Sequence, residues 1–155
     1  MAVVNRHALI DANPLTPLCD GKNTGPGGVS YGLAEAGYDI RVKQDVVLHP
    51  FRRFKLASTI ERFHMPYDLV GVVHDKSTWI RRRLAVFNTV IEPGWRGFLT
   101  LELIYHGWGV LHIPAGSGIA QVLFHRLERF GDYGERGKYQ DQEDRPVAAR
   151  DSKEP

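Results

Sequence analysis

Glu102 lies in the middle of FLTLELIYH (98–106), a stretch that otherwise alternates as a half-buried strand does. It shares one strand face with Phe98 and Thr100, and the opposite face carries three leucines. A carboxylate in such surroundings has its pKa raised, toward a value at which it can accept and then donate a proton. Glu102 is thus a candidate general base and acid. The alternative is a structural role, in which the strand glutamate is paired with a cation at an edge or in a subunit contact. This structural role is favoured when the residue is considered alone.

A second polar group precedes this strand in DKSTWIRRRLAV (75–86). Lys76, Ser77 and Thr78 offer a cation, two hydroxyls and backbone N–H groups where we expect a short helix, capped by the Ser or the Thr, to start. Such groups bind phosphate oxygens. The arginine run that begins at Arg81 is by itself typical of a solvated basic turn.

These residues must be positioned by a mainly β domain. From about residue 30 to about residue 130, short apolar runs recur between turn signals, at the spacing of an all-β barrel or sandwich. The runs are YDIRV (38–42), DVVLH (45–49), RFKLAST (53–59), LVGVVH (69–74), LAVF (84–87), FLTLELIYH (98–106), GVLHI (109–113) and IAQVLFHRL (119–127). Residues 13–30 are rich in Pro and Gly and are expected to form a loop. The only helical candidate is 75–86, with Trp79 and Leu84 on its inner side.

The 155 residues have the size of one domain, which we place at 1–131, followed by a mobile polar tail at 132–155. The formal net charge of +2 is too small to indicate nucleic-acid binding. No apolar run approaches the ~20 residues of a membrane span, and the N-terminus lacks signal-peptide features. We therefore expect a cytoplasmic protein without nucleic-acid or membrane partners.

Three stretches occur in order along the chain, DKSTWIRR (75–82), TVIEPGWRGFLTLEL (89–103) and PAGSGIAQVLF (114–124), with GYDIRV before them and GKYQDQ after them. Together they give the chain a resemblance to the dCTP deaminase branch of the dUTPase-like nucleotide enzymes. It implies a distorted, mostly antiparallel β-barrel with one or two short helices. It also implies a homotrimer with active sites between subunits, in a compact or divergent member of the family, of a viral kind.

The resemblance gives the polar residues their roles. Glu102 matches the catalytic glutamate, which takes a proton from the water that attacks C4 of cytosine and passes it to the leaving amino group. Arg81 and Ser77 match the residues that hold water, developing charge and phosphate. Zinc deaminases carry H-x-E and P-C-x-x-C, whereas this chain has no H-x-E and a single cysteine, Cys19. We therefore expect no zinc, no metal bound by side chains, and Mg²⁺ bound only through the nucleotide triphosphate.

The remaining site residues implied by the resemblance bind the substrate. Trp95 matches the aromatic residue that packs on deoxyribose, and a core position is the equally weighted alternative. Glu92 stands where the family has an aspartate near the sugar 3′-hydroxyl. Gln121 is expected to be a structural hydrogen-bond partner or a contact from a neighbouring subunit. The complete set of expected substrate-binding residues is Lys76, Ser77, Thr78, Asn88, Glu92, Trp95, Gln121, Tyr133, Lys138, Tyr139 and Gln142. The tail segment that carries Tyr133, Lys138, Tyr139 and Gln142 is expected to form a lid over the triphosphate.

The chain departs from the family between Arg81 and Glu92, where it is about two residues shorter in the loop that reads the pyrimidine. FNTVIE (87–92) replaces the usual H-x-T-A pattern and resembles, with a deletion, the uracil-binding loop of dUTPases. Asn88 has both an amide donor and an acceptor and suits either base.

Three functions remain open at this point. The leading one is deamination of dCTP to dUTP and ammonia. The rivals are hydrolysis of dUTP or dCTP to the monophosphate and pyrophosphate, alone or together with deamination, and non-catalytic binding of a nucleotide by a regulator. Feedback by dTTP is known among relatives and cannot be deduced from these residues.

Overall fold

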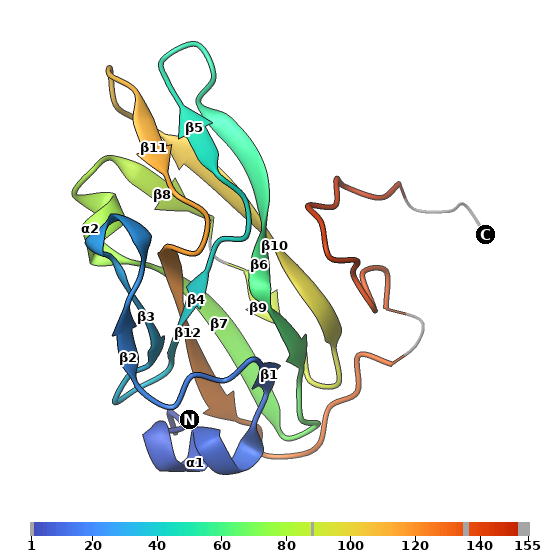
Figure 1. Ribbon diagram of the computed structural model, residues 1–155. Helices are drawn as coiled ribbons and strands as arrows, with labels where there is room; N and C mark the ends of the chain where they lie inside the picture. Colours follow the sequence, from blue (N-terminus) through green and yellow to red (C-terminus); the bar gives the residue numbers. More distant parts are fainter. Residues whose placement is uncertain (1, 88, 135–136, 152–155) are drawn as a thin grey trace.

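The computed structural model describes residues 2–87, 89–134 and 137–151 (Figure 1). Strands dominate it, as expected, and every strand pairing among the described residues is antiparallel. The elements are α1 (Arg6–Ala12), β1 (Leu15–Thr16), β2 (Lys22–Thr24), the 3₁₀ turn η1 (Pro26–Gly28), β3 (Ser30–Leu33), β4 (Tyr38–Arg41), β5 (Val46–Leu48), β6 (Phe54–His64), β7 (Leu69–Asp75), α2 (Ser77–Ile80), β8 (Leu84–Val86), β9 (Val90–Ile91), β10 (Arg96–Tyr105), β11 (Leu111–Ile113) and β12 (Gly118–Arg126).

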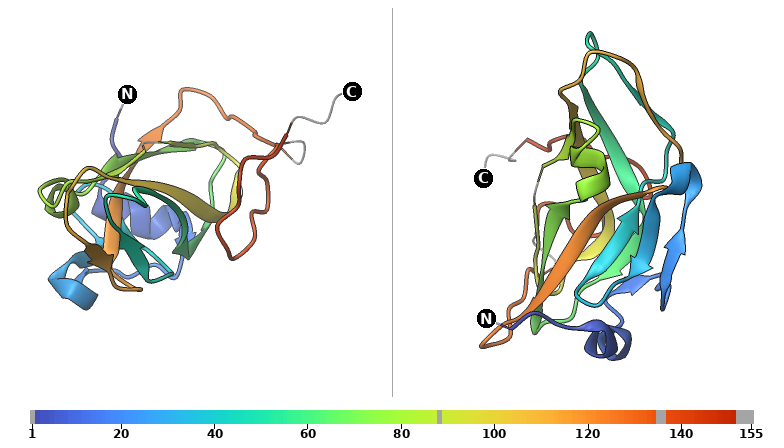
Figure 2. Two further views of the ribbon diagram at one scale, coloured as in Figure 1. Left: turned by 90° about the horizontal axis from the view of Figure 1, so that it is seen from above. Right: turned by 90° about the vertical axis from the view of Figure 1, so that its left-hand side faces the viewer.

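The strands form three sheets that curl around one core (Figures 1 and 2). One sheet has the order β1-β6-β10-β8, the second has the order β2-β3-β4-β12-β7-β9, and β5 and β11 form a two-stranded sheet. Buried side chains from both large sheets, such as Phe63, Leu101 and Leu103 from one and Ile40, Val122 and Phe124 from the other, make up the core. The predicted all-β fold is confirmed.

All eight predicted apolar runs contain a strand. Some, such as β7 and β10, alternate between a buried and a more exposed face over much of their length, whereas β4 and the middle of β6 are buried on both faces. The predicted loop at 13–30 was only partly correct, since it contains β1, β2 and η1. Short strands of two or three residues are too brief to show a period in sequence.

Two details of the helices differ from expectation. The α2 helix is a single turn capped by Lys76 without a side-chain hydrogen bond, so the predicted Ser or Thr cap was wrong. Trp79 and Leu84 are nevertheless both buried, and the Trp79 indole donates to the carbonyl of Gly118 at 2.6 Å. The α1 helix was not predicted, although Asn5 caps its start by accepting from the N–H of Ala8.

A buried ion pair ties the two large sheets together. Glu61 of β6 is completely buried and accepts from the guanidinium of Arg41 at 2.7 Å and from the Arg41 backbone N–H at 2.9 Å. Burial raises the pKa of Glu61, while the bonds from Arg41 act in the opposite direction. This pair fixes β4 against β6.

No helix of the described chain is both long enough and apolar enough to cross a membrane.

Candidate active site

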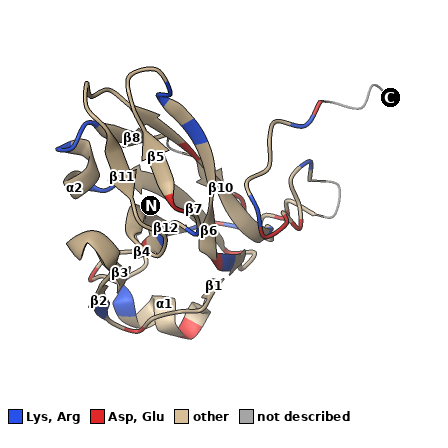
Figure 3. Cartoon of the chain, turned by 45° about the horizontal axis from the view of Figure 1, so that its top comes forward, with Lys and Arg blue, Asp and Glu red and all other residues tan. Residues whose placement is uncertain are grey.

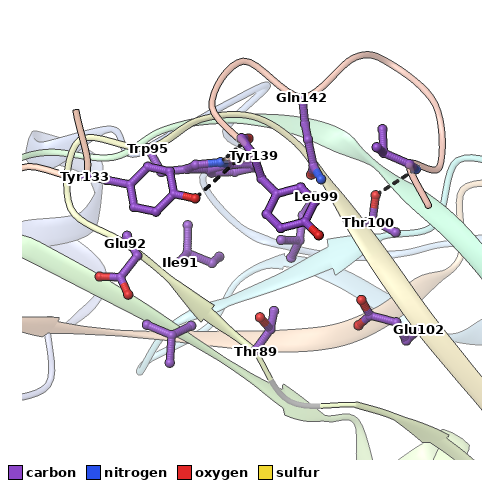
Figure 4. A pocket seen from close by; sticks show the side chains of 12 residues that line it. Thr89, Ile91, Glu92, Trp95, Leu99, Thr100, Glu102, Tyr133, Tyr139 and Gln142 are labelled. Atoms are coloured by element: carbon purple, nitrogen blue, oxygen red, sulfur yellow. Dashed lines mark hydrogen bonds between the residues drawn. The ribbon is translucent and has the colours of Figure 1, made fainter. Parts of the chain in front are cut away.

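One cavity of about 180 Å³ opens between the β9–β10 segment and the tail that follows β12 (Figure 4). It is lined by Thr89, Val90, Ile91, Glu92, Trp95, Leu99, Thr100, Glu102, Tyr133, Tyr139, Gln142 and Val147. Six of the expected site residues are therefore brought together: Glu92, Trp95, Glu102, Tyr133, Tyr139 and Gln142.

Strand β10 places Glu102 in this cavity. The carboxylate points inward, and Thr89 stands across from it (Figure 4). Burial raises the pKa of the Glu102 carboxyl, and its own backbone N–H acts in the opposite direction. Within the described part of the chain, no ion pair or hydrogen bond from another residue engages this carboxylate. The alternative role, a strand glutamate paired with a cation, is therefore not supported by any contact within the described part of the chain.

A β-bulge in β10 changes the lining that alternation predicts. The register against β6 shifts between Phe98 and Thr100, and a bulge re-aims the side chains next to it. Leu99 and Thr100 therefore both line the cavity, although the sequence predicted that they lie on opposite faces. The Leu99 N–H donates to the buried Thr59 hydroxyl at 3.0 Å, which satisfies a backbone group at the bulge.

The turn that precedes β10 orients Trp95 and Glu92. The Trp95 N–H donates to the Glu92 carbonyl at 3.1 Å, and the Trp95 ring lies 6.1 Å from the ring of Phe63. The indole N–H donates to the carbonyl of Tyr139 at 2.7 Å. Trp95 is consequently both a core residue and a wall of the cavity. Glu92 is exposed and lies at the end of the cavity opposite to Glu102 (Figure 4).

The tail after β12 forms one side of the cavity. Tyr133, Tyr139, Gln142 and Val147 contribute to the lining, and the Val147 N–H donates to the Thr100 hydroxyl at 3.0 Å. The Tyr133 hydroxyl accepts from the Tyr139 N–H at 3.3 Å. Much of the described tail is thus packed on the domain, in extended and turn conformations.

Residues 140–142 fasten the tail to the start of β10. Asp141 accepts two hydrogen bonds from the Arg96 guanidinium at 3.0 and 3.1 Å, and these bonds lower the pKa of the Asp141 carboxyl. The Gln140 amide accepts from the Arg96 N–H at 2.8 Å and donates to the Gly94 carbonyl at 3.0 Å. The Gln142 carbonyl accepts from the Phe98 N–H at 3.1 Å.

The α2 residues expected at the site do not line this cavity. The α2 segment packs against β8, outside the cavity. Ser77 and Arg81 are exposed on this segment, and Thr78 is half-buried. The Lys76 ammonium forms an ion pair with Asp39 of β4, so in one chain it is occupied by a carboxylate. Asp39 thus has a structural role within the chain.

Three further residues complete the set. The Gln121 amide donates to the carbonyl of Ala36 at 2.9 Å and lies outside the cavity, which fits the structural one of the two roles expected for it. Lys138 is exposed, with its ammonium 5.7 Å from the ring centroid of Tyr139. Asn88 lies outside the described residues.

Sequence reasoning missed several lining residues, namely Thr89, Val90, Ile91, Leu99, Thr100 and Val147. Thr89 lies in the shortened loop, so its position in the sequence could have identified it as a lining residue. Val147 gives no such signal, because its place depends on one hydrogen bond from a segment without periodicity.

A family model described as dCTP deaminase-like matches residues 32–127. The chain belongs to the dCTP deaminase-like family. The dCTP deaminase of Campylobacter fetus subsp. fetus is 34% identical to it, over 89% of this chain and 90% of that protein. The dCTP deaminase of a Sulfurovum species is 37% identical, over 83% of this chain and 84% of that protein.

Solved structures similar to this dCTP deaminase-like chain are dUTPases of low sequence identity. The dUTPase of Staphylococcus bacteriophage 80alpha has a TM-score of 0.57 and 18% identity, over 74% of this chain and 90% of that chain. A mutant form of the dUTPase from phage phi11 of S. aureus has a TM-score of 0.56 and 19% identity, over 62% of this chain and 80% of that chain. These likenesses confirm the predicted dUTPase-like fold.

Proposed function

We propose that the protein is a dCTP deaminase that converts dCTP and water to dUTP and ammonia. The observation that carries this proposal is the placement of Glu102, a half-buried carboxylate with no partner from another described residue, in a cavity that it shares with Trp95. Family membership supplies the substrate class, and the cavity supplies the group that this chemistry requires.

In the proposed mechanism, Glu102 carries a proton from the attacking water to the leaving amino group of the substrate. Its carboxylate takes a proton from water as the oxygen attacks C4 of cytosine, and a tetrahedral carbon forms. The protonated Glu102 then delivers that proton to the amino group, the C4–N bond breaks, and ammonia leaves. Burial raises the pKa of the Glu102 carboxyl, which moves it toward the range in which one group can both accept and donate a proton.

Trp95 is proposed to support the deoxyribose with its ring, and a ring pressed against C2′ leaves no room for a 2′-hydroxyl. Thr89, which faces Glu102, is placed to contact the base edge. Asn88 stays a prediction for the same edge.

We further propose that the site is completed by a second copy in a homotrimer. The face of the sheet that continues from Glu102 is apolar and partly exposed: the register aligns Leu56 with Glu102, and Phe54 with Ile104. Phe54 is 51% exposed and Phe87, beside this face, is 50% exposed. A second copy packed here would bury these side chains and would bring its Ser77 and Arg81 to the cavity.

The tail is proposed to close over the triphosphate, with Tyr139 and Gln142 at the cavity and Lys138 beside it. No three His, Cys, Asp or Glu side chains among the described residues are grouped to share a metal ion. In this proposal Mg²⁺ arrives with the nucleotide and is held by its phosphate oxygens, where it supplies charge neutralisation.

A second candidate activity is release of pyrophosphate from dUTP, and one observation favours it. Glu92 is an exposed carboxylate at the other end of the same cavity, where it could orient water for attack on the α-phosphate. Its side chain is one methylene longer than the family's aspartate, which alters where that water would lie.

One assay separates these functions. The purified protein is incubated with dCTP or dUTP, with and without Mg²⁺, and ammonia and pyrophosphate are measured separately. Ammonia from dCTP without pyrophosphate supports the deaminase, and both products indicate a bifunctional enzyme. Pyrophosphate alone would refute deamination, and neither product would leave a nucleotide-binding regulator.

A further inference from the structure

Two hairpin turns meet at one end of the molecule and expose large apolar side chains (Figure 1). We call residues 47–55 and 105–112 the apex. His49 and Arg52 pair through two backbone hydrogen bonds of 3.2 and 2.8 Å, which puts Phe51 at the corner of a tight turn. Phe51 is 97% exposed, Trp108 is 78% exposed and Val110 is 72% exposed.

The apex is an ordered structure. The Arg53 guanidinium donates to the carbonyls of Tyr105 and Gly107, both at 3.1 Å, and lies 5.5 Å from the centroid of the Trp108 ring. The Tyr105 N–H donates back to the Arg53 carbonyl at 2.9 Å. These contacts join the two turns and hold Trp108 in place.

The two segments of the apex contain cations and no acidic residue, and the nearest recorded carboxylate is that of Asp45, which lies 3.4 Å from His112 Nε2 at the base of the apex. The apex contains Arg52, Arg53 and Lys55, and the neighbouring turn 81–83, which is attached through the bond from His106 N–H to the Arg83 carbonyl, adds three arginines. These six side chains are a substantial share of the 20 Lys and Arg residues in a chain with 18 Asp and Glu. Figure 3 shows both basic segments at the same end of the molecule. Positive charge is therefore concentrated at this end of the molecule, although the net charge of the whole chain is small.

We propose that the apex is a peripheral docking surface for an anionic lipid bilayer. Phe51, Trp108 and Val110 would enter the headgroup region, where aromatic residues are stable because one part of the ring is apolar and another tolerates water. Arg52 and Lys55 of the apex, with Arg82 and Arg83 of the neighbouring turn, would contact lipid phosphates, since basic clusters beside an apolar anchor are attracted to anionic leaflets. Arg81 is left to the nucleotide site. Such contact needs no membrane-crossing helix, and it departs from our sequence-based expectation of no membrane partner.

The shape of the apex favours a bilayer over two other occupants. A single-stranded nucleic acid is held in a basic groove, whereas the apex projects outward and the main cavities of the described chain are lined by residues outside it. A second copy docked apex to apex would bring like charges together, which disfavours association.

Tryptophan fluorescence provides a direct test, because Trp79 and Trp95 are 1% and 5% exposed. Trp108 is thus the tryptophan whose surroundings change on docking. We expect a blue shift of emission with vesicles of phosphatidylcholine and phosphatidylglycerol, and none with phosphatidylcholine alone. Trp108→Phe should lose the shift but retain most co-sedimentation with the mixed vesicles.

Variants assign the binding to the apex. Phe51→Ala combined with Trp108→Ala, and separately Arg52→Glu, should each reduce co-sedimentation at least tenfold while deaminase activity and thermal stability are kept. Phe130→Ala is the matched control, because Phe130 is 84% exposed on another surface, and it should bind as the parent does.

Four results would overturn the proposal. They are equal binding to neutral vesicles, no loss in the apex variants, apex-dependent binding of a labelled oligothymidine without vesicle binding, and a changed oligomer mass in the apex variants. The last two would assign the apex to nucleic acid and to a second copy, respectively. The first three outcomes do not bear on dCTP turnover, and ammonia release from dCTP, measured on the same variants, shows whether a changed oligomer mass also disturbs the proposed site between subunits.

Discussion

Glu102 combines two properties that rarely occur together in a structural strand residue. It is partly buried, and yet it lacks an ion-pair partner among the described residues. The fully buried Glu61 provides the contrast within the same chain, because Arg41 satisfies both of its oxygens. One glutamate is used to hold two sheets together, and the other remains available to a ligand.

Glu102→Gln should separate chemistry from binding. The amide keeps the size of the side chain but cannot accept the proton from water, so we expect kcat to fall by about 10²–10⁴-fold. Nucleotide affinity, measured by calorimetry, should stay within a few fold. Turnover close to that of the parent would show that another group moves the proton.

The same substitution should change how stability depends on pH. A carboxyl whose pKa is raised on folding binds more protons in the folded state, so its stabilising contribution is present below its unfolded pKa, near the ordinary value of 4.5, and is lost as pH rises through the raised pKa. The melting temperature of Glu102→Gln minus that of the parent should therefore be larger at pH 7 than at pH 4. A difference in melting temperature that is constant with pH would mean that Glu102 titrates normally.

At the scale of elements, the tail depends on a glycine in β10. Gly97 has φ of +142°, and a Cβ built on it would lie 2.5 Å from the backbone nitrogen of Gln142. Gly97→Ala should therefore push the tail away, so that trypsin cleaves after Lys138 or Arg145 faster and KM for dCTP rises about tenfold.

Two comparisons make this prediction specific. Gly21→Ala is the matched control, since a Cβ there meets no atom within 4 Å, and it should leave both measurements unchanged. Asp141→Asn weakens the bonds to Arg96 without backbone strain and should speed cleavage to a smaller extent. Unaltered cleavage in Gly97→Ala would contradict the docked arrangement of the tail.

The sequence predicts elements well where periodicity is present and poorly where single contacts decide. The strands from β4 to β12 were predicted from apolar runs, several of which alternate clearly, as in β7 and β10. The very short β9 was not predicted. The bulge that brings Leu99 into the cavity depends on pairing with β6, and the placement of Val147 depends on one bond to Thr100. The catalytic and sugar-binding candidates Glu102 and Trp95 were found through family motifs. Taken alone, Glu102 was better explained by a structural ion pair, and Trp95 was equally well explained as a core residue.

At the scale of the whole molecule, one chain separates the expected catalytic residues into two places. Glu102 and Trp95 lie in the cavity, while Ser77 and Arg81 lie outside it on the α2 segment. The half-exposed apolar face around Phe54 and Phe87 gives a physical reason for a second copy to cover the region between them. The separation within one chain and the uncovered face are explained together if each site belongs to two subunits.

Mixed oligomers test this arrangement. Glu102→Gln and Arg81→Ala subunits should each be nearly inactive alone, but co-expression should restore activity, because some sites combine an intact Glu102 from one subunit with an intact Arg81 from another. Random mixing in a closed ring gives about one quarter of the parent activity per site. Co-expressed Glu102→Gln and Trp95→Ala should show no such recovery, because both changes lie in the cavity of one chain. If the first pair also failed to recover while light scattering showed trimers, Arg81 and Glu102 would have to act from the same subunit, and α2 would have to move toward the cavity when the nucleotide binds.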